Sequence, residues 1–402
     1  MSDVRRIYLV QAVRAFLYGF SSILIGASLA ATGLNDGAVG AVFTAMLLGM
    51  AISSIAVGRW GEVLGRRRTY IGLLLTMGVA GAIFALTGFV PLLVLAALTG
   101  TLSTDPNEAG PITTVEQSML SLTPPAERSR VYGRYNAVAY LAGAAGALAA
   151  GGPSAVRNIV PGLPPDQRWL LLMPIGAVVC VLLAVRLTGH VEVEGDQPAR
   201  ARGGLQRSKS VVRRLAALFA LDAFAGGFIV QSFLVFWFGR QFSADAQVMG
   251  VVFFGVGLLQ AASSVIAGWL AARFGMLNTM VFSHLPSNVL LALIPFAPSL
   301  EVAVLLLFAR SALSQMDVPA RQAYVAALVD PAERTAAAGY TNAARHVVRP
   351  AGPILASASM GMAAGLPFLI AGGLKAVYDV ALYFTFRRVR LAEDDPAPTR
   401  PA

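Results

Sequence analysis

The 402-residue sequence has few charged residues: they make up 13% of it, whereas soluble domains have roughly a quarter. It has one cysteine, Cys180, which excludes a disulfide framework and a cluster of thiolate ligands. Its three histidines, His190, His284 and His346, are far apart and lack the spacing of metal ligands. We therefore expect no metal site and no cofactor.

Signatures of enzymes and of ATP-driven pumps are also missing. The sequence has no GxSxG, HxxxH or DDxxD pattern and no GxxxxGK[ST] phosphate loop. An integral-membrane enzyme would need such a cluster. A sensor usually has an appended soluble domain, for which the tail after Arg390 is too short. The protein is expected not to be an enzyme.

Long apolar runs make up much of the sequence. Hydrophobic residues make up 56% of the chain and its mean hydropathy is +0.67. Runs such as 70–90 and 169–187 can each cross a hydrocarbon layer ~30 Å thick. Twelve helical spans are expected, at 7–32, 37–57, 70–89, 91–120, 135–155, 168–187, 213–240, 246–270, 277–297, 299–328, 341–362 and 365–386. The expected fold class is an all-α membrane protein.

Arginines and lysines are divided unevenly among the loops. With both termini in the cytoplasm, 22 of the 31 basic residues fall on that side and three fall outside. The positive-inside rule therefore predicts cytoplasmic termini in a plasma (inner) membrane. The net charge of +10 then reflects topology, and no nucleic-acid partner is expected. The expected partners are the lipid bilayer, a small-molecule substrate and protons, and the chain is expected to be a monomer.

The two halves of the sequence repeat each other. Three segment pairs align in order at a nearly constant offset: RAFLYGF (14–20) with DAFAGGF (222–228), GRWGEVLG (58–65) with GWLAARFG (268–275), and PAERSRVYGRYN (125–136) with PAERTAAAGYTN (331–342). Parallel repeats around a central site recur in transporters. The expected domains are a six-helix bundle at 1–190, a cytoplasmic linker at 191–212, a second six-helix bundle at 213–390 and a tail at 391–402.

The stretch GRWGEVLGRRR (58–68) contains more than a membrane anchor needs. Two glycines seven residues apart allow helix ends to approach and turn, and a carboxylate between them can accept hydrogen bonds from arginines or a helix N-terminus. The stretch resembles the loop between helices 2 and 3 of the major facilitator superfamily, with Glu62 for the usual aspartate and Val63 for a basic residue. A plain positive-inside anchor is the alternative.

This resemblance covers nearly the whole chain. It implies two six-helix, pseudo-symmetric bundles that rock about a central site. It also implies a conformational gate at the loop, formed by Gly58, Glu62, Gly65, Arg66 and Arg67. Helix 5 carries GAAGALAAGGP (143–153), which is loosely similar to the glycine-proline motif of the family's drug/proton antiporters.

Ionisable residues inside apolar spans are costly, so each is a candidate for substrate binding or coupling. In expected helix 10, Arg310, Ser314, Asp317 and Arg321 recur at spacings of 4, 3 and 4, which places them on one helix face. The resemblance implies that Arg310 is a cavity arginine. A structural ion-pair stripe is the alternative.

The stretch STDPNEAGPITTVEQ (103–117) interrupts expected helix 4 with prolines and a glycine. Freed backbone at membrane depth is tolerated only around a cavity or within protein. A carboxylate in a dry site can take up and release protons near neutrality. We therefore expect Asp105, Glu108 and Glu116 to be coupling groups, with a place in the helix 4–5 loop as the alternative for Glu116.

Arg14 of helix 1 aligns with Asp222 of helix 7 in the repeat. The family architecture places these helices on either side of a central cavity. We therefore expect Arg14 and Asp222 to meet across it in one state. The alternative is that each has a partner of its own.

Four other charged residues are expected to lie outside the site. Arg345 and Arg349 are within two turns of the cytoplasm, so we expect them to snorkel to the interface. Lys375 and Asp379 are four residues apart and are expected to neutralise each other.

These features together predict a secondary active transporter of a small organic solute that works by alternating access. Proton-coupled efflux is the first expectation, because efflux is common among family members of this length. Facilitative or symport uptake of a small organic anion or metabolite is the alternative.

The topology can be tested by labelling introduced cysteines. A cysteine at Gly162 should react with an impermeant reagent in intact cells, and one at Ser129 only after permeabilisation. The opposite pattern would contradict the twelve-span topology.

Overall fold

A computed structural model describes residues 2–31, 33–105, 110–160, 162, 164–192, 207–329 and 333–389. These residues form helices and no strand. The long helices of the first half are α1 (Asp3–Ala31), α2 (Asp36–Leu64), α3 (Arg66–Leu86), α4 (Val90–Ala97), α5 (Pro111–Leu120), α6 (Pro125–Ala149), α7 (Gly152–Ile159) and α8 (Leu172–Ala184). Those of the second half are α9 (Lys209–Phe228), α10 (Gln231–Phe242), α11 (Ala246–Phe274), α12 (Met276–Leu293), α13 (Leu300–Ser314), α14 (Asp317–Leu328), α15 (Arg334–Val348), α16 (Ala351–Met360) and α17 (Leu366–Phe386).

Within the described residues, 9 helical stretches are long and apolar enough to cross a membrane. The other three expected spans, 91–120, 135–155 and 341–362, are occupied by α4 with α5, by α6, and by α15 with α16. The expected class, an all-α multi-pass membrane protein, is confirmed.

Several expected helices are interrupted. Expected helix 10 ends as α13 and restarts as α14. Pro319 lies in the first turn of α14 and has no N–H to bond back to Gln315, which favours the restart at Asp317. The expectation of one continuous face from Arg310 to Arg321 was therefore wrong. Expected helix 7 is also divided, into α9 and α10.

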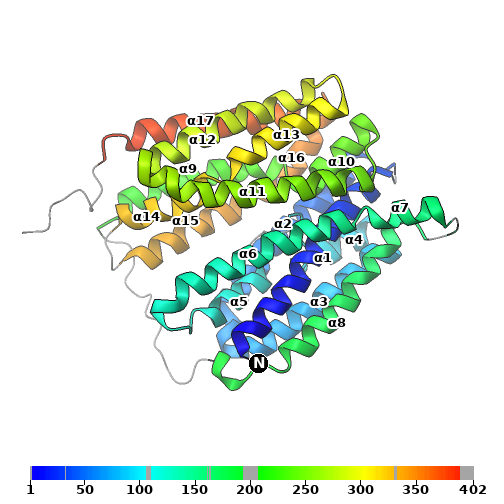
Figure 1. Cartoon of the computed structure of the whole chain (residues 1–402), viewed down its shortest axis with the longest axis horizontal. Helices are drawn as coiled ribbons and strands as arrows, with labels where there is room; N and C mark the ends of the chain where they lie inside the picture. Colours follow the sequence, from blue (N-terminus) through cyan, green and yellow to red (C-terminus); the bar gives the residue numbers. More distant parts are fainter. Residues whose placement is uncertain are drawn as a thin grey trace, which may run out of the picture.

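The helices form two bundles, α1–α8 and α9–α17, that touch at one end (Figure 1). Across the divide α1 packs on α10, α2 on α16, and α6 on α11. These contacts lie at the end where Ala31, Phe242 and Met360 are found, which we call the far end. The opposite end, with Asp3 and Ser208, is the linker end. There α14 and α15 diverge from α5 and α6, at the left of Figure 1.

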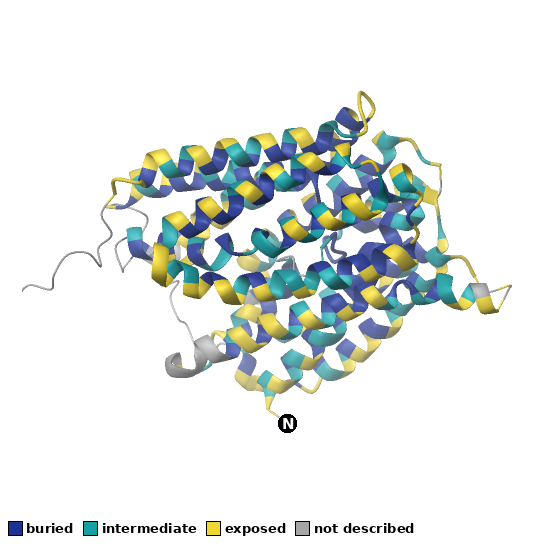
Figure 2. Cartoon of the chain, turned by 45° about the horizontal axis from the view of Figure 1, so that its top comes forward, coloured by how far each residue is buried: buried dark blue, intermediate teal, exposed yellow. Residues whose placement is uncertain are grey.

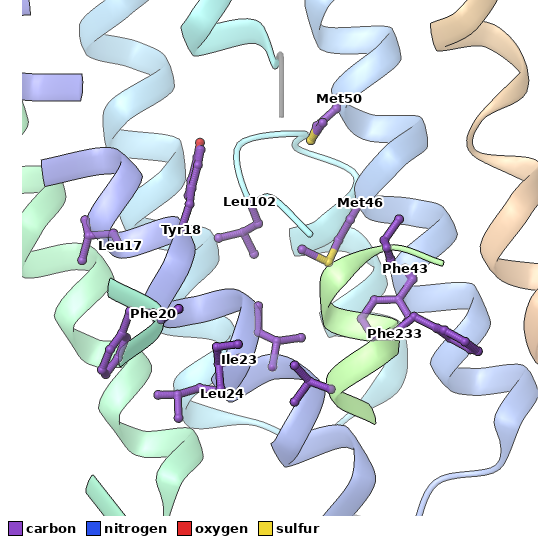
Figure 3. Close-up of a cluster of buried hydrophobic side chains, with 14 of the residues drawn as sticks. Leu17, Tyr18, Phe20, Ile23, Leu24, Phe43, Met46, Met50, Leu102 and Phe233 are labelled. Carbon is purple, nitrogen blue, oxygen red and sulfur yellow. The ribbon is translucent and has the colours of Figure 1, made fainter. Parts of the chain in front are cut away.

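The apolar core has the same asymmetry. One large cluster fills the first bundle and continues into the far end of the second. Phe233 of α10 lies beside Phe43 and Met46 of α2 in this cluster (Figure 3). A separate cluster, with Phe219 and Tyr324, is confined to the linker end of the second bundle. Exposed positions follow the outward faces of the helices (Figure 2).

Glycines allow the far end to close. A Cβ on Gly250 of α11 would lie 2.6 Å from the carbonyl oxygen of Ala147 in α6, and one on Gly26 of α1 would lie 2.5 Å from that of Ser232 in α10. Both distances are shorter than a carbon and an oxygen can sustain, so the bundles meet this closely only where the side chain is a hydrogen.

Gly250→Ala should therefore destabilise the protein by about 1–3 kcal/mol, as overpacking does, and lower its midpoint of thermal unfolding in detergent. Gly268→Ala in the same helix is the matched control, because a Cβ there meets nothing within 4 Å. The control should keep or raise the midpoint, since alanine favours a helix over glycine. Equal midpoints in the two variants would contradict the close approach.

Candidate functional site

The loop between α2 and α3 is held by a carboxylate from the chain that follows α8. Gly65 has a φ of 86°, which glycine adopts without strain. The backbone N–H groups of Arg66 and Arg67 then donate to the Glu192 carboxylate at 2.8 and 3.1 Å. This capping acceptor lies 126 residues from the loop, and local sequence gave no sign of it.

The expected gate residues have different surroundings. The guanidinium of Arg66 donates to the carbonyl of Ser118 at 3.1 Å, so the loop also contacts α5. Arg67 donates to the carbonyl of Leu187, also at 3.1 Å. A Cβ on Gly58 would meet nothing within 4 Å, so the expected close approach at Gly58 was wrong. The side chain of Glu62 lies outside the described residues.

A buried ionic network occupies the first bundle. Arg14 of α1 is 2% exposed and Glu116 of α5 is 0% exposed. A guanidinium nitrogen of Arg14 donates to Glu116 Oε2 at 2.6 Å and also contacts the side-chain oxygen of Gln11. The hydroxyls of Tyr70 and Tyr135 donate to the two oxygens of Glu116 at 2.6 and 2.5 Å. Glu116 is thus a paired interior carboxylate in a helix, and the loop alternative was wrong.

This network supplies Arg14 with a partner in its own bundle. Asp222 likewise has partners in the second bundle: Lys375 at 2.5 Å, Arg321 at 3.4 Å and Arg345 at 3.9 Å. In this structure Arg14 and Asp222 therefore do not pair with each other, and the alternative of separate partners describes it.

Asp222 is the centre of a second, larger ionic cluster. Arg321 bridges it to Asp317 at 2.9 Å, an i,i+4 pair in α14. Lys375 of α17 lies 2.5 Å from Asp222, so the expectation that it pairs with Asp379 was wrong. Helix 12 thus contributes to this cluster, and its expected place outside the substrate site stays a prediction. Arg345 of α15 lies 3.9 Å from Asp222 and faces this cluster. The expectation that Arg345 snorkels to the membrane interface was therefore wrong.

His284 and Asp379 complete this second cluster, which sequence reasoning missed. Nδ1 of His284 lies 2.8 Å from Asp379 Oδ1, and Asn288 donates to Asp379 Oδ2 at 2.8 Å. His284 Nε2 lies 3.9 Å from Asp222. His284 and Asn288 are four residues apart in an apolar run, a spacing that could have indicated a polar face on α12.

Asp105, in the irregular stretch after α4, contacts residues of the second bundle. One oxygen of its carboxylate accepts from the N–H of Gln231, the first residue of α10, at 2.9 Å, and the other lies 3.0 Å from Arg349. The carbonyl of Thr104 accepts from the N–H of Ser232 at 3.2 Å. The irregular stretch after α4 therefore caps the N-terminus of α10, where a negative charge is favourable.

Arg310 is the remaining expected group at the divide. Among the described residues no acceptor lies within hydrogen-bond or ion-pair distance of its guanidinium, and its Nε is buried. Asp105 and Asp222 are the carboxylates that act on it electrostatically. Glu108 lies outside the described residues.

The cations and the acids near the divide differ in exposure. The side chains of Arg345 and Arg349 are both 26% exposed, whereas the acids Asp222 and Asp317 are almost fully buried and paired. No three His, Cys, Asp or Glu side chains in the described part of the chain come together as metal ligands.

Known proteins share the fold and the sequence pattern. The sequence model of the Major Facilitator Superfamily matches residues 7–240 and 215–402. The "Uncharacterized membrane protein YJR124C" of Saccharomyces cerevisiae is 24% identical over 96% of this chain and 94% of its own. A bacterial homologue of the human lysosomal transporter Spinster, in an inward-facing and occupied conformation, superposes with a TM-score of 0.75 at 15% identity, over 98% of both chains. The nucleoside transporter NupG (D323A mutant) gives 0.73 at 14% identity, over 96% of this chain and 99% of its own.

The buried pair of the first bundle makes a stability prediction. Arg14→Met leaves the Glu116 carboxylate buried without its cation, which should cost about 3–5 kcal/mol. Adding Glu116→Leu should recover part of this loss, because the buried charge is then gone. Unfolding midpoints in detergent measure both effects.

Arg157→Gln is the control, because its pair with Asp166 is partly exposed and should contribute at most about 1 kcal/mol. If the double variant were no more stable than Arg14→Met, the two residues would not form an energetic pair.

Proposed function

Because the chain belongs to the major facilitator superfamily, we propose that it is a proton-coupled secondary transporter that moves a small organic solute across a membrane by alternating access. The known transporters with this fold and the absence of enzyme signatures in the sequence support transport over catalysis. The proposed membrane is the plasma (inner) membrane, with both termini in the cytoplasm, as the distribution of arginines suggests.

One observation carries the proposal: among the described residues the main contacts between the bundles lie at the far end, and Asp105 of the first bundle meets Arg349 of the second beside them. The contact is made by α1, α2 and α6 against α10, α16 and α11. With the linker end cytoplasmic, the conformation is closed toward the outside. Alternating access requires this contact to open, and with it the hydrogen bonds of Asp105 to Gln231 and Arg349.

The charges favour an anionic solute. Arg310 has no ion-pair partner among the described residues, and the side chains of Arg345 and Arg349 are each 26% exposed. A carboxylate or phosphate can accept two parallel hydrogen bonds from a guanidinium. The function that this geometry supports best is therefore uptake of a small organic anion together with protons. Exchange of the solute for protons, the efflux expected from the sequence, is the second proposal.

A two-stage assay tests these proposals. Small carboxylates, organic phosphates, amines and neutral sugars are first compared by how far each raises the unfolding midpoint of the purified protein. Radiolabelled forms of the stabilising solutes are then offered to proteoliposomes with a proton gradient in either direction. Uptake that follows the proton gradient inward indicates symport, and uptake against it indicates exchange.

Arg310→Gln should reduce the uptake by about tenfold or more, the effect of losing one charge-assisted hydrogen bond. Arg273→Gln is the matched control, because Arg273 stacks on Trp269 and Phe274 away from the divide. Stabilisation by amines or sugars alone would contradict an anionic solute, and accumulation that ignores the proton gradient would contradict coupling.

A further inference from the structure

We propose that two glycine pairs, Gly58 with Gly339 and Gly133 with Gly268, are the surfaces on which the bundles dock at the linker end when the far end opens. The inference rests on the proposed alternating access. One of these glycines lies in each of α2, α15, α6 and α11. All four are exposed, and among the described residues nothing lies within 4 Å of a Cβ built on any of them. In the present conformation these faces therefore have room for a partner.

The far-end contact between α6 and α11 sets a register for the two helices. A Cβ on Gly250 would lie 2.6 Å from the carbonyl oxygen of Ala147, and one on Gly257 would lie 2.9 Å from the Cβ of Ala144. Residue numbers rise along α11 while those of the contacted residues fall along α6. The two helices therefore run antiparallel at this contact.

Gly268 and Gly133 continue this register toward the linker end. Gly268 lies eleven residues beyond Gly257 in α11, and Gly133 lies eleven residues before Ala144 in α6. Eleven residues are about three turns of an α-helix, so both glycines lie on the faces with which α6 and α11 already touch. If the contact extended along both helices, these two glycines would meet.

The contact of α2 with the second bundle has the same geometry. A Cβ on Gly40 would lie 2.6 Å from the hydroxyl oxygen of Ser357 in α16. Gly58 lies eighteen residues beyond Gly40, and Gly339 lies eighteen residues before Ser357. Eighteen residues are about five turns, so each glycine returns to the face of the far-end contact. Both residues between α15 and α16 have right-handed helical backbone angles, which continues this face from one helix into the other.

Gly49 shows which face of α2 belongs to its own bundle. It lies halfway between Gly40 and Gly58, about two and a half turns from each, and therefore on the opposite face. A Cβ on Gly49 would lie 2.6 Å from the carbonyl oxygen of Leu98, in the first bundle. The face of Gly58 is thus the one that α2 presents to the second bundle.

The sequence repeat relates the two pairs to each other. Gly58 aligns with Gly268, and Gly133 aligns with Gly339. A two-fold axis between parallel repeats therefore converts one pair into the other. Glycine lets helix backbones approach closely, so these two related contacts can close the linker end as the far end is closed now.

Disulfide cross-linking tests the pairs without a known substrate. In the full chain with Cys180→Ala, held in lipid nanodiscs, one variant carries Gly58→Cys with Gly339→Cys and another carries Gly133→Cys with Gly268→Cys. A disulfide requires Cα atoms within about 7 Å of each other, so oxidation traps the conformation that is closed at the linker end. Mass spectrometry of the linked peptides measures the rate for each pair.

The far-end contact provides a second measurement. Adding Gly250→Ala weakens that contact, because its new Cβ would lie too close to α6. The linker end should then be closed more often, and both pairs should cross-link faster by about fivefold or more.

The matched controls place one cysteine of each pair on the opposite helix face. Trp60→Cys replaces Gly58→Cys, and Ile266→Cys replaces Gly268→Cys; both positions are exposed and lie two residues from the glycine. Two residues turn a side chain by roughly 200° around the helix, so the control pairs should cross-link more slowly. Unfolding midpoints before oxidation confirm that each variant is folded.

The inference is wrong if the glycine pairs cross-link no faster than their controls, with and without Gly250→Ala. This outcome is distinct from failure of the transport proposal. Solute movement into proteoliposomes by a protein whose glycine pairs do not cross-link would contradict the pairs and leave transport standing. Cross-linking in a protein that moves no solute would contradict transport and leave the closure of the linker end standing.

Discussion

A charge placed inside an apolar helix bundle needs a partner, and the interior of this protein is arranged around that requirement. Moving a carboxylate or a guanidinium out of water costs several kcal/mol, which only a close opposite charge and further hydrogen bonds offset. Glu116 has Arg14 and two tyrosine hydroxyls within 2.6 Å, and these donors come from α1, α3 and α6. One carboxylate therefore fixes how four helices of the first bundle pack.

The second bundle meets the same requirement with the signs reversed. Arg14 aligns with Asp222 in the sequence repeat. Their partners, Glu116 of α5 and Arg321 of α14, lie in the fourth expected span of each half. The pair between the first and the fourth helix of each half is retained, while cation and anion have exchanged places. The second bundle adds Lys375 and Arg345 around its carboxylate, and Asp317 and Asp379 add two further negative charges to the same cluster.

Span positions and the repeat were predictable because apolar length and internal alignment are properties of the chain alone. The partners of charged residues were not. The spacing of Lys375 and Asp379 favours a local i,i+4 pair, but Asp222 and His284 on other helices compete successfully for them. Likewise Glu116 follows a proline-glycine break that suggests a loop, and its burial is made favourable by Arg14, Tyr70 and Tyr135, which are distant in sequence. Which charges meet depends on how helices are arranged across the bundle, and periodicity does not encode this.

Asp105 differs from Glu116, Asp222, Asp317 and Asp379 because its partners lie in the opposite bundle. If the far end opens, the N-terminus of α10 loses its cap and Arg349 loses its carboxylate at the same moment. Both losses leave positive charge facing the divide. An anion that binds there would lower the cost of opening by taking the place of the Asp105 carboxylate, whereas a cation would raise it. In the proposed function, the contact that closes the far end and the preference for a negatively charged solute would thus have one physical origin.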